Sequence, residues 1–280
     1  MPESLAPVLI APCARPVPPT SYRSSPVVEL VDYFNHRFAN QLPTDREAAD
    51  LFFLRGDRVC ARISGTTLHS EFRTLAGSDD DRAPALLARL VGCDTDGRLL
   101  PATQFFARFG RAPTIVTIDR ACRVLHMLNH LALGHDAADL WLHVSPRHVL
   151  GVAAGHGQFF EDVLQRCGLG PERVTLVAPF LSRARAEFRR YARGLANYRR
   201  RGYGLAIDLR DAWPVEAAAS LRELAPDWLR LPCERFLELG AELPDVPVLL
   251  RDAPGAVPTW QRLRQGVVWQ ELATASAAGA

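Results

Sequence analysis

The amino-acid sequence predicts an α/β protein whose main body is a barrel of parallel βα units, with a separate helix near the N-terminus. Short strand-like runs alternate with longer helix-like stretches throughout the chain after Gly97. This alternation continues without a break in composition, so one closed (β/α) barrel fits better than an open sheet or two domains. The chain has 280 residues, 48% of them hydrophobic, which is enough to bury a large core.

The N-terminal part of the chain contains two different segments. Residues 1–25 are rich in proline, serine and alanine, and we expect a disordered tail there. Residues 26–47 are expected to hold a helix that Pro43 ends. Its apolar positions recur with a period close to that of a helix: Val27, Leu30, Val31, Phe34 and Phe38. This apolar face packs either on the barrel or on a partner, and in the second case it is a candidate homodimer contact.

The barrel domain is expected at residues 48–270, followed by a flexible tail at residues 271–280. It begins with two strand-like runs, Leu51–Leu54 and Arg58–Ile63, that form a hairpin or a meander, and a polar loop follows at Gly77–Arg82. The later strands are expected at Leu140–Val144, Val174–Val177, Leu205–Leu209, Trp228–Leu231 and Val246–Leu250. The helices are expected at 102–110, 118–133, 157–168, 182–201, 214–224 and 258–264.

The composition excludes several classes of function. All 33 basic residues are arginine, so any mechanism that needs a side-chain amine is excluded. The net charge is only +2, so the protein as a whole is not built to bind polyanions, and we do not expect a nucleic-acid partner. The six cysteines are scattered without metal-site spacing. Because there is neither a membrane-length apolar run nor a signal-peptide pattern, we expect a cytoplasmic protein without a membrane partner.

Seven short motifs, in this order, carry a family likeness: LPATQFF (100–106), TIDR (117–120), LWLHVSPRHV (140–149), GLGPERVTL (168–176), RRRGYGLAIDLRD (199–211), APDWLRLPCERF (225–236) and QG (265–266). In order and spacing they resemble the bacterial EAL domain, the family of cyclic di-GMP phosphodiesterases. The resemblance covers about residues 65–268. It implies a modified TIM (β/α)8 barrel with one antiparallel strand, which agrees with the barrel predicted from the alternation.

The resemblance also implies a catalytic site that this sequence has largely lost. The family uses Mg or Mn, held by carboxylates at the ends of barrel strands. Glu71, Asp208 and Gln265 match positions of the family motifs. The altered positions are His143 for an asparagine, Val177 and Phe180 for glutamates, Leu209 for an aspartate, Arg230 for a lysine, Pro232 for an aspartate and Arg251 for a glutamate. We therefore expect no catalytic residues and no metal, and Mg or Mn only if the protein still hydrolyses its substrate.

Several of these residues have two interpretations. Glu71 is either a metal ligand or an exposed carboxylate at a strand end. His143 is either a ligand for a softer metal or a hydrogen-bonded histidine of the barrel. Arg230 and Arg251 would repel a metal ion, and they either fill the vacant charge site or pair with Asp208.

Two features outside the family motifs also have alternative interpretations. His126 and His130 have the i, i+4 spacing of a zinc site, but a surface or packing role is the simpler interpretation. The arginine-rich helix 182–201 is either a contact for an acidic protein or nucleic acid, or simply the solvated face of a barrel helix.

Three functions follow from the resemblance. The first is a catalytically inactive regulator that acts through another protein in cyclic di-GMP-related signalling. The second is a receptor that binds cyclic di-GMP without hydrolysing it, with Arg73, Arg230 and Arg251 as candidate phosphate ligands. The third, an active metal-dependent phosphodiesterase, requires more carboxylates than the sequence retains.

Overall fold

The computed structural model describes most of the chain. The described residues are 26–39, 41–42, 50–77, 84–153, 155–210, 217–239, 243–251 and 268–271. Several predicted features fall outside them: the tail at 1–25, the helix end at Pro43, the polar loop after Gly77, the helix at 258–264, Gln265 and most of the tail at 271–280.

Eight strands form a closed barrel, which confirms the predicted fold. They are β3 (Thr66–Gly77), β4 (Ala85–Cys93), β6 (Asp139–His143), β7 (Val174–Pro179), β8 (Gly204–Asp208), β9 (Trp228–Pro232), β10 (Val248–Arg251) and β11 (Val268–Glu271). Strand β4 and the strands from β6 to β11 pair in parallel, whereas β3 pairs antiparallel with both β4 and β11 and closes the ring. The barrel therefore has one antiparallel strand, as the family resemblance implied.

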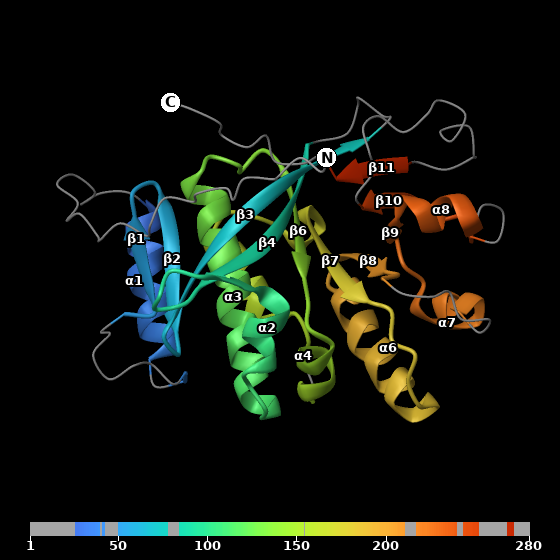
Figure 1. Cartoon of the computed structure of the whole chain (residues 1–280), viewed down its shortest axis with the longest axis horizontal. Helices are drawn as coiled ribbons and strands as arrows, with labels where there is room; N and C mark the ends of the chain where they lie inside the picture. Colours follow the sequence, from blue (N-terminus) through green and yellow to red (C-terminus); the bar gives the residue numbers. More distant parts are fainter. Residues whose placement is uncertain are drawn as a thin grey trace, which may run out of the picture.

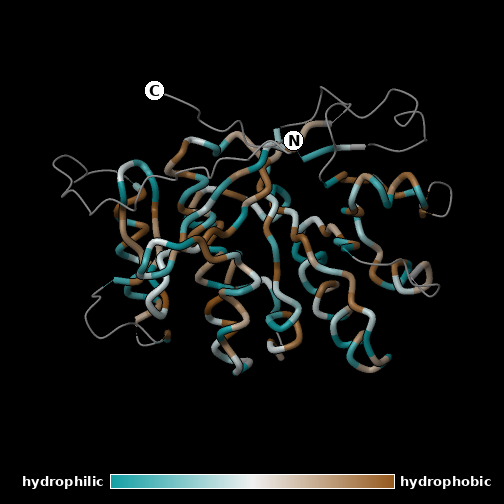
Figure 2. The backbone as a smooth tube through the Cα atoms, in the orientation of Figure 1, coloured by the Kyte–Doolittle hydropathy of each residue, from teal (hydrophilic) through white to brown (hydrophobic). Residues whose placement is uncertain are grey.

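The helices lie outside the strands, as Figure 1 shows for α3, α4 and α6. They are α2 (Ala102–Ala107), α3 (Ala112–Ala132), α4 (Pro146–Gly151), α5 (Gln158–Arg166), α6 (Arg185–Arg200), α7 (Ala217–Leu224) and α8 (Cys233–Leu239), with a short 3-10 turn, η1 (Pro171–Arg173). In Figure 2 these helices alternate between hydrophobic and hydrophilic residues, as helices do when one face covers a sheet. None of the described helices is both long and apolar enough to cross a membrane.

An N-terminal layer extends the sheet beyond the barrel. It consists of α1 (Pro26–Phe38), β1 (Phe52–Arg55) and β2 (Arg58–Ile63), with β5 (Leu99–Pro101) at the opposite edge. The strands β1, β2 and β3 form the predicted antiparallel meander. The Phe38 ring lies 5.9 Å from that of Phe52 and 5.8 Å from that of Phe159. The apolar face of α1 therefore packs within the chain, and the helix ends well before residue 47.

The side chain of Asn129 in α3 connects the N-terminal meander, through β2, to the barrel helices. Its side chain is fully buried; the amide nitrogen donates to the carbonyl of Val59 at 2.8 Å, and the amide oxygen accepts from the Val59 N–H at 3.0 Å. The amide nitrogen also lies 3.0 Å from the carbonyl of Leu125 in its own helix. One side chain thus satisfies both backbone groups of a strand residue that no solvent reaches.

The Asn129→Ala variant is expected to lower the free energy of unfolding by about 2–3 kcal/mol, because two buried backbone groups of Val59 lose their partner. Urea unfolding followed by circular dichroism measures this loss. The matched control is Gln165→Ala on the exposed side of α5, which should change stability by less than about 0.5 kcal/mol. Equal midpoints for the two variants would contradict the anchoring role.

Candidate functional site at the barrel mouth

The interior of the barrel has two layers of different chemistry. The lower layer is apolar and contains Trp141, Trp228 and Trp269, whose ring centroids are 4.9–6.4 Å apart. Side chains on a strand alternate between its two faces, so the residue two positions further along also points inward. That step leads from Trp228 to Arg230 and from Trp269 to Glu271. The layer above the indoles, at the carboxyl ends of the parallel strands, is therefore charged.

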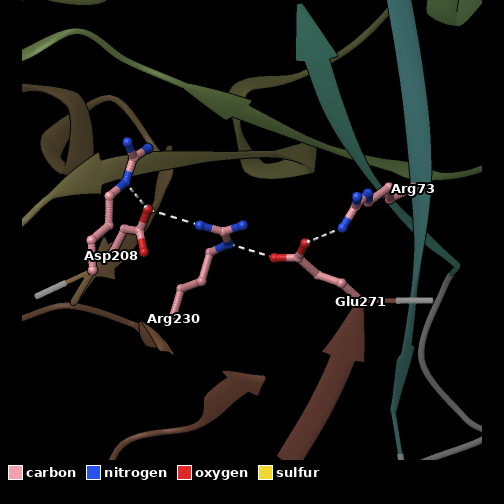
Figure 3. A network of polar contacts seen from close by, with 5 residues as sticks. Arg73, Asp208, Arg230 and Glu271 are labelled. Carbon is pink, nitrogen blue, oxygen red and sulfur yellow. Dashed lines mark hydrogen bonds and ion pairs between the residues drawn. The ribbon is translucent and has the colours of Figure 1, made fainter. Parts of the chain in front are cut away.

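These charged residues form one continuous network, which we term the arginine–carboxylate ladder (Figure 3). Arg230 Nη1 donates to Asp208 Oδ2 at 2.8 Å, and Arg230 Nε donates to Glu271 Oε1 at 2.5 Å. Arg210 Nε binds the same Asp208 oxygen at 2.7 Å. Arg73 of the antiparallel strand closes the network through Glu271 Oε2 at 3.4 Å. The ladder connects β8, β9, β11 and β3, and three guanidinium groups face two carboxylates.

The centre of the ladder is almost completely shielded from water. The side chains of Asp208 and Glu271 are 0% and 1% exposed, and that of Arg230 is 7% exposed. Burial by itself lowers the pKa of Arg230, but the two carboxylates outweigh burial and raise it. The guanidinium therefore stays charged, and it balances the carboxylates in a region where an unpaired charge costs several kcal/mol.

A cavity of about 650 Å³ opens beside the ladder. Its polar lining includes Glu71, Arg89, His143 and Arg210, and its apolar wall comes from β4, β5 and α2. It is also lined by Asp119, Cys122, Arg123 and His126 of α3. Arg210 contributes to both the cavity and the ladder, so the two are neighbouring parts of one site.

His143 ends β6 on the cavity wall and is electrically neutral. Burial lowers its pKa well below the usual histidine value, and the nearby positive charges of Arg230 and Arg210 lower it further. No hydrogen bond to its ring occurs within the described part of the chain, so the prediction of a hydrogen-bonded barrel histidine finds no partner there. The ring instead presents a neutral imidazole to the cavity.

The structure corrects the placement of Glu71. It was predicted as a metal ligand or an exposed strand-end carboxylate, but it lies in the middle of β3 and is only partly exposed. In the antiparallel register it stands opposite Arg89 of β4. Because β3 runs against the other strands, its middle rather than its carboxyl end reaches the mouth. Glu71 therefore belongs to the cavity wall and lies outside the ladder.

The other altered positions lie around the ladder but contribute no ligands. Val177 is fully buried in the lower layer, and Leu209 is buried in the outer core. Phe180 packs against that core, and its backbone N–H donates to the carbonyl of Asp208 at 2.9 Å. Pro232 ends β9 and Arg251 ends β10, both partly buried. The structure thus pairs Arg230 with Asp208, as one of the predicted interpretations required, and it adds Arg73, which was predicted only as a phosphate ligand.

Three residues of the site escaped the sequence prediction. Glu271 was assigned to the flexible tail, which is wrong, since it ends β11 and is buried. The apolar run that precedes it, VVW (267–269), is a strand signal that the sequence does contain. Arg210 and Arg89 were not singled out, because every basic residue of the chain is arginine and this frequency hides the few that line the cavity.

His126 and His130 are buried in α3, so of the two roles predicted for them the packing role is the one that occurs. His126 Nδ1 lies 2.8 Å from Ser70 Oγ, whereas the His130 ring packs near those of Phe72 and His135. Within the described ranges, no three histidine, cysteine or acidic residues are grouped closely enough to hold a metal ion.

Comparison with known proteins identifies the class of fold. No protein-family model matches the sequence, and no curated protein matches it. Among solved structures, the EAL domain of FimX from Pseudomonas aeruginosa bound to c-di-GMP superimposes with a TM-score of 0.56 at 14% identity, over 73% of this chain and 87% of that chain. The match therefore defines an EAL-type α/β barrel.

Two further structures support the same assignment. Bacillus subtilis YkuI, in complex with substrate c-di-GMP and calcium, gives a TM-score of 0.53 at 14% identity, over 73% of this chain and 54% of that one. PaMucR phosphodiesterase in its c-di-GMP complex gives 0.51 at 17% identity, over 72% and 89%. This chain thus has the fold of an EAL domain, as its motifs suggested, and it spans about half of YkuI.

Removing the centre of the ladder is expected to be strongly destabilising. The Arg230→Ala variant leaves Asp208 and Glu271 buried without their shared counter-charge, and the free energy of unfolding at pH 7 should fall by about 3–5 kcal/mol. The matched control is Arg235→Ala, which breaks the exposed ion pair with Glu238 and should cost less than about 1 kcal/mol. Urea unfolding compares the two, and similar losses would contradict the central role of Arg230.

The buried His126 predicts a loss of stability in mild acid. Burial lowers its pKa to about 3, whereas an unfolded histidine titrates near 6.5. Between these values only the unfolded state binds the proton, so His126 destabilises the protein by about 1.4 kcal/mol per pH unit as the pH falls. The His126→Gln variant should lose this contribution. Urea unfolding midpoints between pH 6 and 4 test this. If the midpoints of the wild type and the variant fell in parallel with pH, the contribution assigned to His126 would be refuted.

Proposed function

We propose that this protein is a non-hydrolysing EAL-fold regulator that acts through contacts with another protein in cyclic di-GMP-related signalling. The observation that carries the proposal is the position of Arg230, whose guanidinium bridges Asp208 and Glu271 at the carboxyl end of the barrel. A positive side chain stands where the resemblance implies a lysine within a metal-dependent site. The barrel is preserved, while the chemistry of its mouth is altered.

The side-chain oxygens that the described residues offer as metal ligands do not fit Mg or Mn. Hard divalent cations take about six oxygen ligands, several of them carboxylates. The oxygens of Asp208 and Glu271 already accept from arginines, and only Asp208 Oδ1 lacks a hydrogen-bond partner within the described residues. Val177 and Leu209 supply no oxygen from their side chains. These oxygen atoms suit a guanidinium better than a metal ion.

The side chain of Arg230 also does not support proton transfer. The family lysine that helps to activate water is replaced by Arg230, whose pKa is raised by the two carboxylates. A guanidinium that stays charged neither accepts nor releases a proton at physiological pH. His143, the nearest imidazole on the cavity wall, is held neutral by burial and by arginines, so it is a poor acid for a leaving group.

A second candidate function is a receptor that binds cyclic di-GMP without hydrolysing it. The cavity favours it, because its volume of about 650 Å³ lies in the usual range for small-molecule sites and it combines an apolar wall with arginines. FimX, YkuI and PaMucR were all solved with c-di-GMP. Arg73, Arg210 and Arg230 are all held by carboxylates of the ladder, so Arg89 is the better phosphate contact.

Incubation with cyclic di-GMP and either Mg or Mn is expected to give no linear dinucleotide, because arginines already bind the carboxylates of the ladder and Arg230 does not exchange a proton. Chromatography of the products measures turnover, with PaMucR phosphodiesterase as the positive control. Mn should also leave Tm unchanged. A linear product whose yield rises with Mn and vanishes with EDTA would overturn the proposal.

Calorimetry with cyclic di-GMP separates the two candidate functions. A regulator that works only through a protein partner gives no heat of binding at high micromolar ligand. A receptor gives a dissociation constant that the Arg89→Ala variant weakens at least tenfold, in line with the loss of one charge-assisted phosphate contact of about 1.5–3 kcal/mol. The surface variant Arg235→Ala should bind as the wild type does.

A further inference from the structure

The outer face of α6 carries an unusual density of unpaired positive charge. Phe188, Tyr191, Leu195 and Tyr198 are buried on its inner side, as the sequence predicted. Arginines are exposed on its outer side: Arg185, Arg189, Arg190, Arg193, Arg199 and Arg200. The segment from Phe188 to Arg200 contains no acidic residue. The helix is therefore amphipathic, with a polar side made largely of guanidinium groups.

Two arginines of α6 have acidic partners in or just after α7 among the described residues. Arg185 pairs with Glu223 at 3.4 Å, and Arg199 pairs with Asp227 at 3.0 Å. For Arg189, Arg190 and Arg193, which we term the arginine face, no ion-pair partner occurs among the residues that the structure describes. These three side chains occupy two consecutive turns in the middle of the helix. The charges next to α7 are thus neutralised, and those that point to solvent are not.

Local helix stability does not explain this arrangement. Arg189 and Arg193 are four residues apart, and Arg190 and Arg193 are three apart, so like charges are neighbours and each pair costs about 0.2–0.5 kcal/mol. In α8, by contrast, Arg235 pairs with Glu238 one turn away. The arginine face therefore carries an electrostatic cost that an acidic partner would remove.

The helix is a rigid platform for such a partner. At Gly194 a Cβ atom would lie 2.6 Å from a side-chain atom of Val149, so α6 and α4 approach each other as closely as glycine allows. Tyr191 donates from its hydroxyl to the carbonyl of Pro179 at 2.9 Å, which ties the helix to the end of β7. Arginines held on a fixed backbone lose less freedom on binding than those on a loop.

The chemistry of the face favours an acidic protein over a nucleic acid. The aromatic rings of α6 all lie on the buried side, so none is available to stack on bases. The net charge of +2 gives little long-range attraction for a polyanion. On a partner helix, carboxylates three or four residues apart have the same spacing as these arginines. Each carboxylate can then accept two hydrogen bonds from one guanidinium.

We propose that the arginine face of α6 is the docking surface for a carboxylate-rich helix of a partner protein. This inference rests on the proposed regulatory function and names the surface through which it acts. The face lies on the outside of the barrel, on residues that line neither the cavity nor the ladder. Partner binding and ligand binding therefore have separate residues and are tested separately.

The probe is a labelled synthetic 21-residue helix of alanine with glutamate pairs spaced four residues apart, measured by fluorescence anisotropy. The wild type is expected to bind it, with an affinity that falls as NaCl rises from 50 to 150 mM. The double variant Arg189→Glu, Arg193→Glu should bind at least tenfold more weakly. Its Tm should stay close to that of the wild type, because the two exchanged positions still repel each other while the pair with Arg190 becomes attractive, and an unchanged Tm shows that the variant is folded.

The matched control is Arg222→Glu, an exposed arginine on the neighbouring helix α7. Its affinity for the peptide should stay within twofold of the wild type. Equal losses for the two variants would overturn the proposal, as would absence of peptide binding by the wild type. Tighter binding of a 20-base-pair DNA duplex or of phosphatidylserine vesicles than of the peptide, lost in the double variant, would also overturn it in favour of that anion.

The outcomes distinguish this inference from the proposed function. Peptide binding at α6 together with hydrolysis of cyclic di-GMP would retain the docking surface and reject the non-hydrolysing regulator. Absence of hydrolysis together with absence of peptide binding would retain the regulator and reject the surface. The Arg89→Ala variant, which alters the cavity, should bind the peptide as the wild type does.

Discussion

The need to balance buried charge determines the architecture of the barrel mouth. Asp208 and Glu271 point into a space that water does not reach, and neither carboxylate is tolerable there without a positive partner. Arg230 supplies that partner to both, and Arg73 and Arg210 extend the compensation to the edges. Because these residues come from four strands, the balance of charge also fixes how those strands meet. The antiparallel strand β3 is part of this arrangement, since it brings Arg73 beside Glu271.

The residues of the ladder are also the reason for proposing that this barrel does not hydrolyse cyclic di-GMP. In a metal-dependent site, bound cations hold acidic residues together, and the cations can also activate water. In the proposed regulator, Arg230 of the protein itself holds the acidic residues together, and a guanidinium does not activate water. What remains is a shaped, arginine-lined cavity at the mouth and a charged helix on the outside. Both are proposed binding surfaces, and they lie on different elements of the fold.

The sequence predicted most of the fold, and its failures have a common cause. The βα alternation, the buried face of α1 and the pairing of Asp208 with Arg230 follow from local pattern and motif order. The place of Glu71 depends on the register of β3 against β4, and the contact of Glu271 with Arg73 depends on the register of β3 against β11, which joins residues nearly 200 positions apart. No local pattern encodes that register. Strand β3 also mixes polar and apolar residues at its mouth end, where the cavity replaces the core, and this weakens its strand signal.

The cluster of indoles beneath the ladder has a consequence for how the protein can be observed. Trp228 and Trp269 each stand two residues before a charged member of the ladder on the same strand, and Trp141 packs against both. Indole emission responds to the electric field of nearby charges. The barrel therefore contains an intrinsic optical reporter directly below its most polar layer, and movements of the guanidinium above it are readable in the protein's own fluorescence without any added label.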